Sequence, residues 1–223
     1  MTKKKISFGI LIFLLSAATV LCGYKIYSEL SVRNCEKQDF DAIVRLVTAD
    51  EKDDSETEDQ PYAEQKRNLK ALFNQNSDCI GWIYIPGTAI NYPVMHTPSN
   101  PQKYLRRDFY GNYSQSGVPF LDSRCNLKST NLIIYGHNMR NGTMFSDVKN
   151  YANAAFRKAH PVIEFETANG IYKFNVIDVK ITDTADKKYN EIYSENDRFL
   201  TLSTCYGNQE SGRILVTAKE EIQ

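Results

Sequence analysis

The chain has 223 residues, of which 42% are hydrophobic and 24% are charged, a balance that suits one globular domain with an appendage. Lysine plus arginine and aspartate plus glutamate number 27 each, so the formal net charge is zero. This balance gives no support to functions based on bulk electrostatics, such as binding nucleic acid or other polyanions.

The N-terminus carries the clearest topological signal. Three lysines over 3–5 precede a nearly continuous apolar run over 6–23, which is close to the shortest helix that crosses a bilayer. Basic residues before such a run favour a cytoplasmic N-terminus. We therefore expect a cytoplasmic tail over 1–5, a single-pass transmembrane signal-anchor over 6–23, and everything after Tyr24 outside the cell. A cleaved signal peptide, with Ala17-Ala18-Thr19 as a loose cleavage site, is the alternative.

Residues 24–78 are predicted to form a helical stalk that packs near the following domain. Apolar residues recur at roughly helical spacing over 28–48 and again over 62–76. The strongly acidic run between them, over 49–60, lacks the alternating Asp/Asn pattern and the glycine of a calcium loop. We therefore expect this run to be a solvated linker or helix face.

From residue 79 onwards the pattern changes to short strands separated by Gly, Pro and Asn turns. We expect short helical turns over 102–108 and over 144–158. Many short strands with small helical insertions predict a mainly β domain, a barrel or sandwich, over 79–223. The eight predicted strands are 82–87, 90–94, 118–121, 131–135, 162–166, 172–180, 199–204 and 214–219.

Five cysteines in an exported chain leave at least one thiol unpaired. Cys22 lies in the apolar run, and Cys35, Cys79 and Cys125 have no metal-ligand spacing around them. No metal or organic cofactor is implied. Cys205 differs from the other four because of its neighbours.

A thiol, a guanidinium and an imidazole stand at predicted strand ends. Cys205 ends the run Thr201-Leu202-Ser203-Thr204-Cys205, and Arg213 starts the next strand after a loop with two glycines. In a hairpin these two residues face each other, and a nearby cation favours the thiolate. His137 follows the strand 131–135 through Gly136. A nucleophile, an oxyanion stabiliser and an acid/base together predict cysteine-based acyl transfer.

These motifs resemble the sortases, over roughly residues 78–220. Besides the cysteine and arginine motif, the resemblance rests on Tyr135-Gly136-His137-Asn138-Met139 and on Gly142-Thr143-Met144-Phe145. Class B in particular is indicated by Gly81-Trp82-Ile83, Asn91-Tyr92-Pro93-Val94, Tyr104-Leu105 and Phe109-Tyr110-Gly111.

The resemblance implies an eight-stranded β-barrel, with Cys205 as nucleophile, His137 as acid/base and Arg213 as the residue that positions substrate and stabilises the oxyanion. Such enzymes of Gram-positive cells cut a sorting signal, LPxTG-like or NPxTN-like, after Thr. They pass the acyl group from surface proteins to an amine of the cell-wall precursor. Leu105, by similarity, and Ser203, by strand alternation, are expected in the substrate groove, with Asn100 as a weaker candidate.

Two features depart from class B. The stretch 181–198 before the cysteine strand is short, with room for one helical turn around 189–194, whereas class B members usually carry a long helical insertion there. Tyr206 stands where an acidic residue is common. The sorting signal, and the choice between wall anchoring and pilin polymerisation on a pilin lysine, therefore stay open.

Two further alternatives are a cell-wall cysteine peptidase of the papain-like kind and a non-catalytic surface domain that binds a partner. Papain-like folds place the cysteine before the histidine, the reverse of this chain. His96 and His160 lie in loop-like contexts and are weaker candidates for the base than His137. Asp122 or Asp178 are candidates to orient His137, and the sequence places neither beside it.

Overall fold

The computed structural model describes residues 2–48, 67–184, 197–209 and 211–221. It divides the chain into two compact units, Met1–Arg45 and Leu46–Gln223. The predicted acidic linker and the predicted helical turn over 189–194 lie outside the described residues, as does the start of the helix predicted over 62–76. The predicted domain boundary at 78/79 stays a prediction.

The described part of the first unit lies within the helix α1 (Thr2–Thr48), which includes the helix predicted over 28–48. A helix needs about 20 consecutive, mainly apolar residues to cross the hydrocarbon core. Among the residues described, the helices include none with the length and apolar character to do so. The predicted transmembrane anchor over 6–23, and with it the single-pass localisation, is contradicted by this finding.

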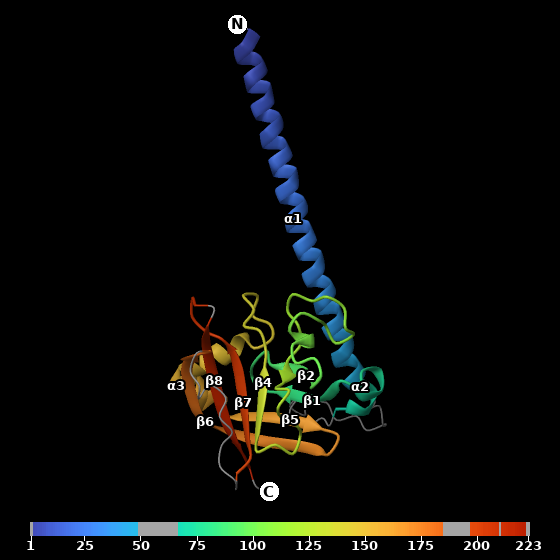
Figure 1. The fold of residues 1–223 in the computed structure, drawn as a ribbon, viewed down its shortest axis with the longest axis vertical. Coiled ribbons are helices and arrows are strands. Elements are labelled where there is room, and N and C mark those ends of the chain that lie inside the picture. Colours follow the sequence, from blue (N-terminus) through green and yellow to red (C-terminus); the bar gives the residue numbers. More distant parts are fainter. Residues whose placement is uncertain (1, 49–66, 185–196, 210, 222–223) are drawn as a thin grey trace, which may run out of the picture. The chain divides into compact units, whose positions relative to one another are not determined.

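The second unit contains all the described strands, together with short helices and 3₁₀ turns (Figure 1). The strands are β1 (Cys79–Tyr84), β2 (Asn91–Met95), β3 (Phe120–Leu121), β4 (Asn131–Tyr135), β5 (Val162–Thr167), β6 (Gly170–Asp183), β7 (Phe199–Cys205) and β8 (Gly212–Glu220). The helical elements are α2 (Leu69–Gln75), η1 (Lys103–Leu105), η2 (Ser146–Ala152) and α3 (Ala154–Ala159).

These eight strands, within the described part of the chain, close into a barrel in the order β1-β2-β3-β4-β7-β8-β6-β5. The eight predicted strands match them, which confirms the mainly β prediction and selects the barrel over the sandwich. Closure pairs the edge strands β1 and β5, so the sheet keeps no free edge. The barrel interior is filled by large apolar side chains, among them Ile83, Ile134, Phe165, Phe174, Leu202 and Val216.

Most neighbouring strands run antiparallel, but β2 and β3 are parallel, and so are β4 and β7, with Tyr135 opposite Ser203. The carboxyl ends of parallel neighbours meet at one edge of a sheet. The residues that follow β4 therefore leave the barrel beside the end of β7, although about 70 residues of sequence separate them. This single pairing brings the segment of His137 to the segment of Cys205.

Candidate active site

Cys205 is the last residue of β7 and pairs with Arg213 on β8, as the hairpin prediction required. The backbone amide of Tyr206 donates a hydrogen bond to the carbonyl of Gly212 (3.0 Å). The next pair, Cys205 and Arg213, therefore occupies a non-hydrogen-bonded position, where facing side chains approach most closely. Burial ends at this point, because all of β7 is buried except Cys205, which is exposed.

The turn that follows depends on two glycines. Gly207 has φ of +76°, a left-handed conformation that favours glycine. A side chain at Gly212 would collide with the carbonyl oxygen of Tyr206. Both requirements help to hold the register that puts the thiol opposite the guanidinium. The Arg213 guanidinium is itself oriented by donating from Nη1 to the carbonyl of Gly212 (2.8 Å).

His137 is held at the end of β4 by contacts with the end of β7. The hydroxyl of Thr204 donates to the carbonyl of Gly136 (2.7 Å), and the Asn138 side-chain amide donates to the carbonyl of Cys205 (3.0 Å). Gly136 is needed because an added Cβ would lie 2.5 Å from the ring of Phe145. The chain around the imidazole is thus tied to the thiol-bearing strand on both sides of His137.

The imidazole itself contacts a backbone carbonyl. Nε2 of His137 lies 2.9 Å from the carbonyl oxygen of Leu105. Because a carbonyl only accepts, Nε2 carries the proton, and Nδ1 is the nitrogen that can gain or lose one. Burial lowers the pKa of His137 and the charges of Arg106 and Arg213 lower it further, while the Leu105 hydrogen bond raises it; the net shift is downward. The neutral ring is therefore favoured near neutral pH.

Among the hydrogen bonds of the described residues, none joins His137 to either acidic candidate. Asp122 instead accepts hydrogen bonds from Arg124 and Tyr135, and Asp178 is exposed on β6. The other two histidines lie in structural positions. His160 Nδ1 donates to the carbonyl of Pro86 (2.8 Å) and the His96 amide donates to the carbonyl of Asp78 (2.8 Å).

Thiol, guanidinium and imidazole share one pocket of about 470 Å³. Ser203 and Leu105 also line it, whereas Asn100 does not, although the next two residues of the chain do. Thr201, which alternates with Ser203 along β7, does not line the pocket, because its hydroxyl donates to Asn131 and is buried. The full lining is Pro101, Gln102, Leu105, Phe120, Asp122, Ser123, Arg124, Tyr135, Gly136, His137, Ser203, Thr204, Cys205 and Arg213.

Several residues that line this pocket were not predicted from the sequence, among them Arg124, Gln102 and Thr204. Arg124 had a weak signal, because Asp122-Ser123-Arg124 directly follows a predicted strand. Gln102 and Thr204 had none, since their places depend on how distant segments pack.

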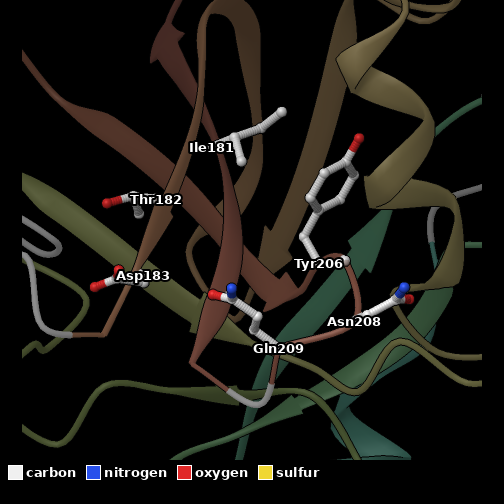
Figure 2. A pocket seen from close by; sticks show the side chains of 8 residues that line it. Ile181, Thr182, Asp183, Tyr206, Asn208 and Gln209 are labelled. Atoms are coloured by element: carbon white, nitrogen blue, oxygen red, sulfur yellow. The ribbon is translucent and has the colours of Figure 1, made fainter.

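A second pocket, of about 810 Å³, begins one residue beyond the thiol. Figure 2 shows Tyr206, Asn208 and Gln209 of the β7–β8 loop on one side of it and Thr182 and Asp183 at the end of β6 on the other. Cys205 lines the first pocket and not the second. Among the described residues no cluster of His, Cys, Asp and Glu side chains has the arrangement of a metal site.

Comparison with known proteins identifies the family to which this architecture is similar. A family model described as the sortase domain matches residues 83–221. Sortase B of Staphylococcus aureus is 32% identical over 180 residues, which cover 68% of this chain and 73% of that protein. Sortase B of Listeria monocytogenes is 30% identical over 185 residues, 70% of this chain and 75% of that protein.

Solved structures agree with the sequences. Clostridium perfringens sortase B is similar with a TM-score of 0.64 and 31% identity, over 69% of this chain and 99% of that one. A Staphylococcus aureus sortase B–substrate complex is similar with a TM-score of 0.61 and 30% identity, over 69% of this chain and 84% of that one. The chain belongs to the sortase family, in its class B, and is a cysteine transpeptidase.

Proposed function

We propose that this transpeptidase cleaves a C-terminal sorting signal, LPxTG-like or NPxTN-like, after its Thr and transfers the acyl group to an amine of the cell-wall precursor. The observation that carries the proposal is the pocket shared by Cys205, Arg213 and His137, which three separate segments of the chain bring together. Sortases in general act on surface proteins that bear sorting signals and on cell-wall precursors.

In the first half-reaction Nδ1 of His137 takes the proton of the Cys205 thiol, and the thiolate that results attacks the carbonyl carbon of the Thr residue. The oxyanion that forms lies within reach of the Arg213 guanidinium, whose charge offsets it. The C–N bond then breaks, the departing amine takes a proton from Nδ1 of His137, and a thioester on Cys205 remains. Leu105 and Ser203, which line the same pocket, contact the acyl part of the signal.

In the second half-reaction the acceptor amine attacks the thioester carbonyl. Nδ1 of His137 takes the proton that the amine loses, and the C–S bond breaks to return the thiolate. The same nitrogen therefore serves as acid and then as base, while Nε2 stays bonded to the Leu105 carbonyl. The second pocket, which Tyr206 lines one residue beyond the thiol, offers the acceptor an approach separate from that of the donor.

The experiment incubates the protein with LPxTG-like and NPxTN-like peptides and a glycine-based amine, and intact-protein mass spectrometry follows Cys205. The expected result is a thioester on Cys205 with one of the peptides and a transfer product with the amine. A folded protein with an alkylatable Cys205 that forms no adduct with either peptide would overturn the proposed substrate.

The acceptor is tested by competition between the glycine-based amine and a lysine-containing pilin-like peptide. Preference for the glycine amine supports transfer to the cell-wall precursor. Preference for the lysine ε-amine would overturn that acceptor and support pilin polymerisation. Hydrolysis at a rate that no added amine diverts would point to a peptidase instead. Cys205→Ala serves as the control for adduct formation at any other thiol.

A further inference from the structure

The pocket has a second end, formed by the residues that follow β3. Because β3 is antiparallel to β4, with Phe120 opposite Tyr135, the chain leaves β3 away from the edge at which Cys205 and His137 lie. β4 also separates β3 from β7 in the barrel. Arg124 lines this far end of the pocket. The proposed nucleophile and Arg124 thus stand at opposite ends of one continuous pocket.

The Arg124 guanidinium is held in one orientation by a buried carboxylate. Its Nε donates to Oδ1 of Asp122 (2.9 Å) and its Nη2 donates to Oδ2 (2.7 Å). The backbone amide of Arg124 also donates to Oδ1 (2.9 Å), and the hydroxyl of Tyr135 donates to Oδ2 (2.8 Å). Four donors thus saturate the carboxylate and fix a planar guanidinium before any ligand arrives.

Burial differs sharply between the two partners. The Asp122 side chain is 8% exposed, whereas that of Arg124 is 56% exposed. Burial alone raises the pKa of Asp122, but the hydrogen bonds from Arg124 and Tyr135 outweigh it and lower the pKa to about 2. The carboxylate therefore stays ionised beneath the guanidinium, and Nη1 of Arg124 has no bond to another described residue in this arrangement.

The charges that line the pocket do not cancel. Arg124 and Arg213 contribute two positive charges against one negative charge from Asp122, and His137 favours its neutral form. The net lining charge is therefore +1, in a chain whose overall formal charge is zero. A peptide with a carboxylate at the right distance from the scissile bond complements this lining, and one with a lysine there opposes it.

We propose that Arg124 is a specificity residue that binds a carboxylate-bearing side chain of the peptide, upstream of the bond that is cleaved. This inference rests on the proposed function, because it takes the sorting signal as the occupant of the pocket. The upstream residues stay attached to Cys205 through both half-reactions, so they occupy the pocket that runs away from the thiol. A carboxamide side chain at the same position binds less tightly, because it offers one neutral acceptor in place of two charged ones.

The experiment replaces each residue upstream of Thr in turn by Glu, Gln or Lys and measures kcat/KM for every peptide. At one position the protein is expected to prefer Glu over Lys by about five- to tenfold, the range for a charged hydrogen bond at a half-exposed site. Arg124→Gln is expected to reduce this ratio to about twofold or less, and Arg124→Lys, which keeps the charge without the planar fork, to give an intermediate ratio.

Lys128→Gln is the matched control, because it removes one exposed positive charge from the same β3–β4 loop outside the pocket. This variant should keep the preference of the unmodified protein. An equal preference in Arg124→Gln and the unmodified protein would overturn the inference, and so would the absence of any charge preference in the unmodified protein.

Peptide affinity for Cys205→Ala, with and without Arg124→Gln, gives a second readout that needs no turnover. A Glu preference in binding that Arg124→Gln removes, together with no turnover of any peptide by the unmodified protein, supports the inference and overturns the proposed reaction. Turnover of a peptide without any charge preference would support the proposed reaction and overturn the inference about Arg124. The failures of the two proposals are therefore distinguishable.

Discussion

The thiol side and the imidazole side of the pocket are held in place by different means. Cys205 and Arg213 are eight residues apart in one hairpin, and backbone register alone makes them neighbours. His137 is oriented by the carbonyl of Leu105, 32 residues earlier in the chain. The first arrangement is local and hard to disturb by changing a side chain. The second depends on whatever fixes the segment around Leu105.

That segment is fixed by a polar cluster and a close backbone contact. The Tyr104 hydroxyl donates to Asp78 (2.8 Å), and the Lys103 ammonium lies 2.6 Å from the same carboxylate. On its other side Gly117 approaches so closely that an added Cβ would lie 2.7 Å from the Leu105 carbonyl oxygen. Substitutions far from the reacting atoms should therefore affect the imidazole side and spare the thiol side.

The largest effect on activity is expected from Cys205→Ala, on the thiol side. Loss of the proposed nucleophile should reduce transfer at least about 10³-fold. The unfolding free energy should change by less than about 1 kcal/mol, because Cys205 is exposed and backbone register holds the hairpin. Peptide transfer and urea unfolding measure the two quantities. Turnover that survives in this variant would remove Cys205 from the mechanism.

On the imidazole side, Gly117→Ala should reduce kcat about ten- to hundredfold, because it displaces the carbonyl that orients His137. Its positive φ adds a backbone cost of about 1–3 kcal/mol in unfolding free energy. Gly111→Ala is the matched control, since Gly111 also has positive φ but has open space around it. Equal kcat in the two variants would show that the contact with Leu105 does not position the histidine.

A smaller effect is expected from Tyr104→Phe, which removes the hydroxyl that binds Asp78 and accepts from Asn76. We predict a loss of about 1–2 kcal/mol in unfolding free energy and a fall of a few-fold in kcat. Tyr151→Phe is the control, because it removes a hydroxyl that donates to the His160 carbonyl, away from the pocket. An unchanged kcat in Tyr104→Phe would show that the Asp78 cluster stabilises the fold without helping to position His137.

The smallest effect concerns pH and stability. The folded state lowers the pKa of His137, so between that value and about 6.5 the unfolded chain binds more protons. The stabilising contribution of the neutral ring is therefore present above about pH 6.5 and lost as the pH falls. From pH 7.5 to 5.5, urea unfolding should show a larger loss of stability in the unmodified protein than in His137→Gln. His96, whose pKa is also lowered, is common to both proteins. A larger loss of stability in His137→Gln than in the unmodified protein would contradict a lowered pKa of His137 in the folded state.

Sequence patterns predicted what depends on local periodicity. All eight strands were located, and the pairing of Cys205 with Arg213 followed from loop composition and strand alternation. The parallel pairing of β4 with β7 was not predicted, because no sequence signal tells which distant strands become neighbours.

Contacts that involve backbone carbonyls or buried polar side chains were also missed. An acidic residue was sought as the partner of His137, but the partner is the carbonyl of Leu105, a group that every residue possesses and that therefore leaves no sequence signal. Thr201 alternates correctly with Ser203 and Cys205, yet it is buried against Asn131 because both faces of β7 are covered.

The measurement that tests most directly whether Leu105 positions His137 is nitrogen-detected NMR of the imidazole at pH 7.5. The arrangement predicts a neutral ring with its proton on Nε2, bonded to the Leu105 carbonyl, and a lone pair on Nδ1. The population of this tautomer should fall in Gly117→Ala and stay unchanged in Gly111→Ala. A proton found on Nδ1 of the neutral ring, or a tautomer equilibrium that Gly117→Ala leaves unchanged, would contradict it.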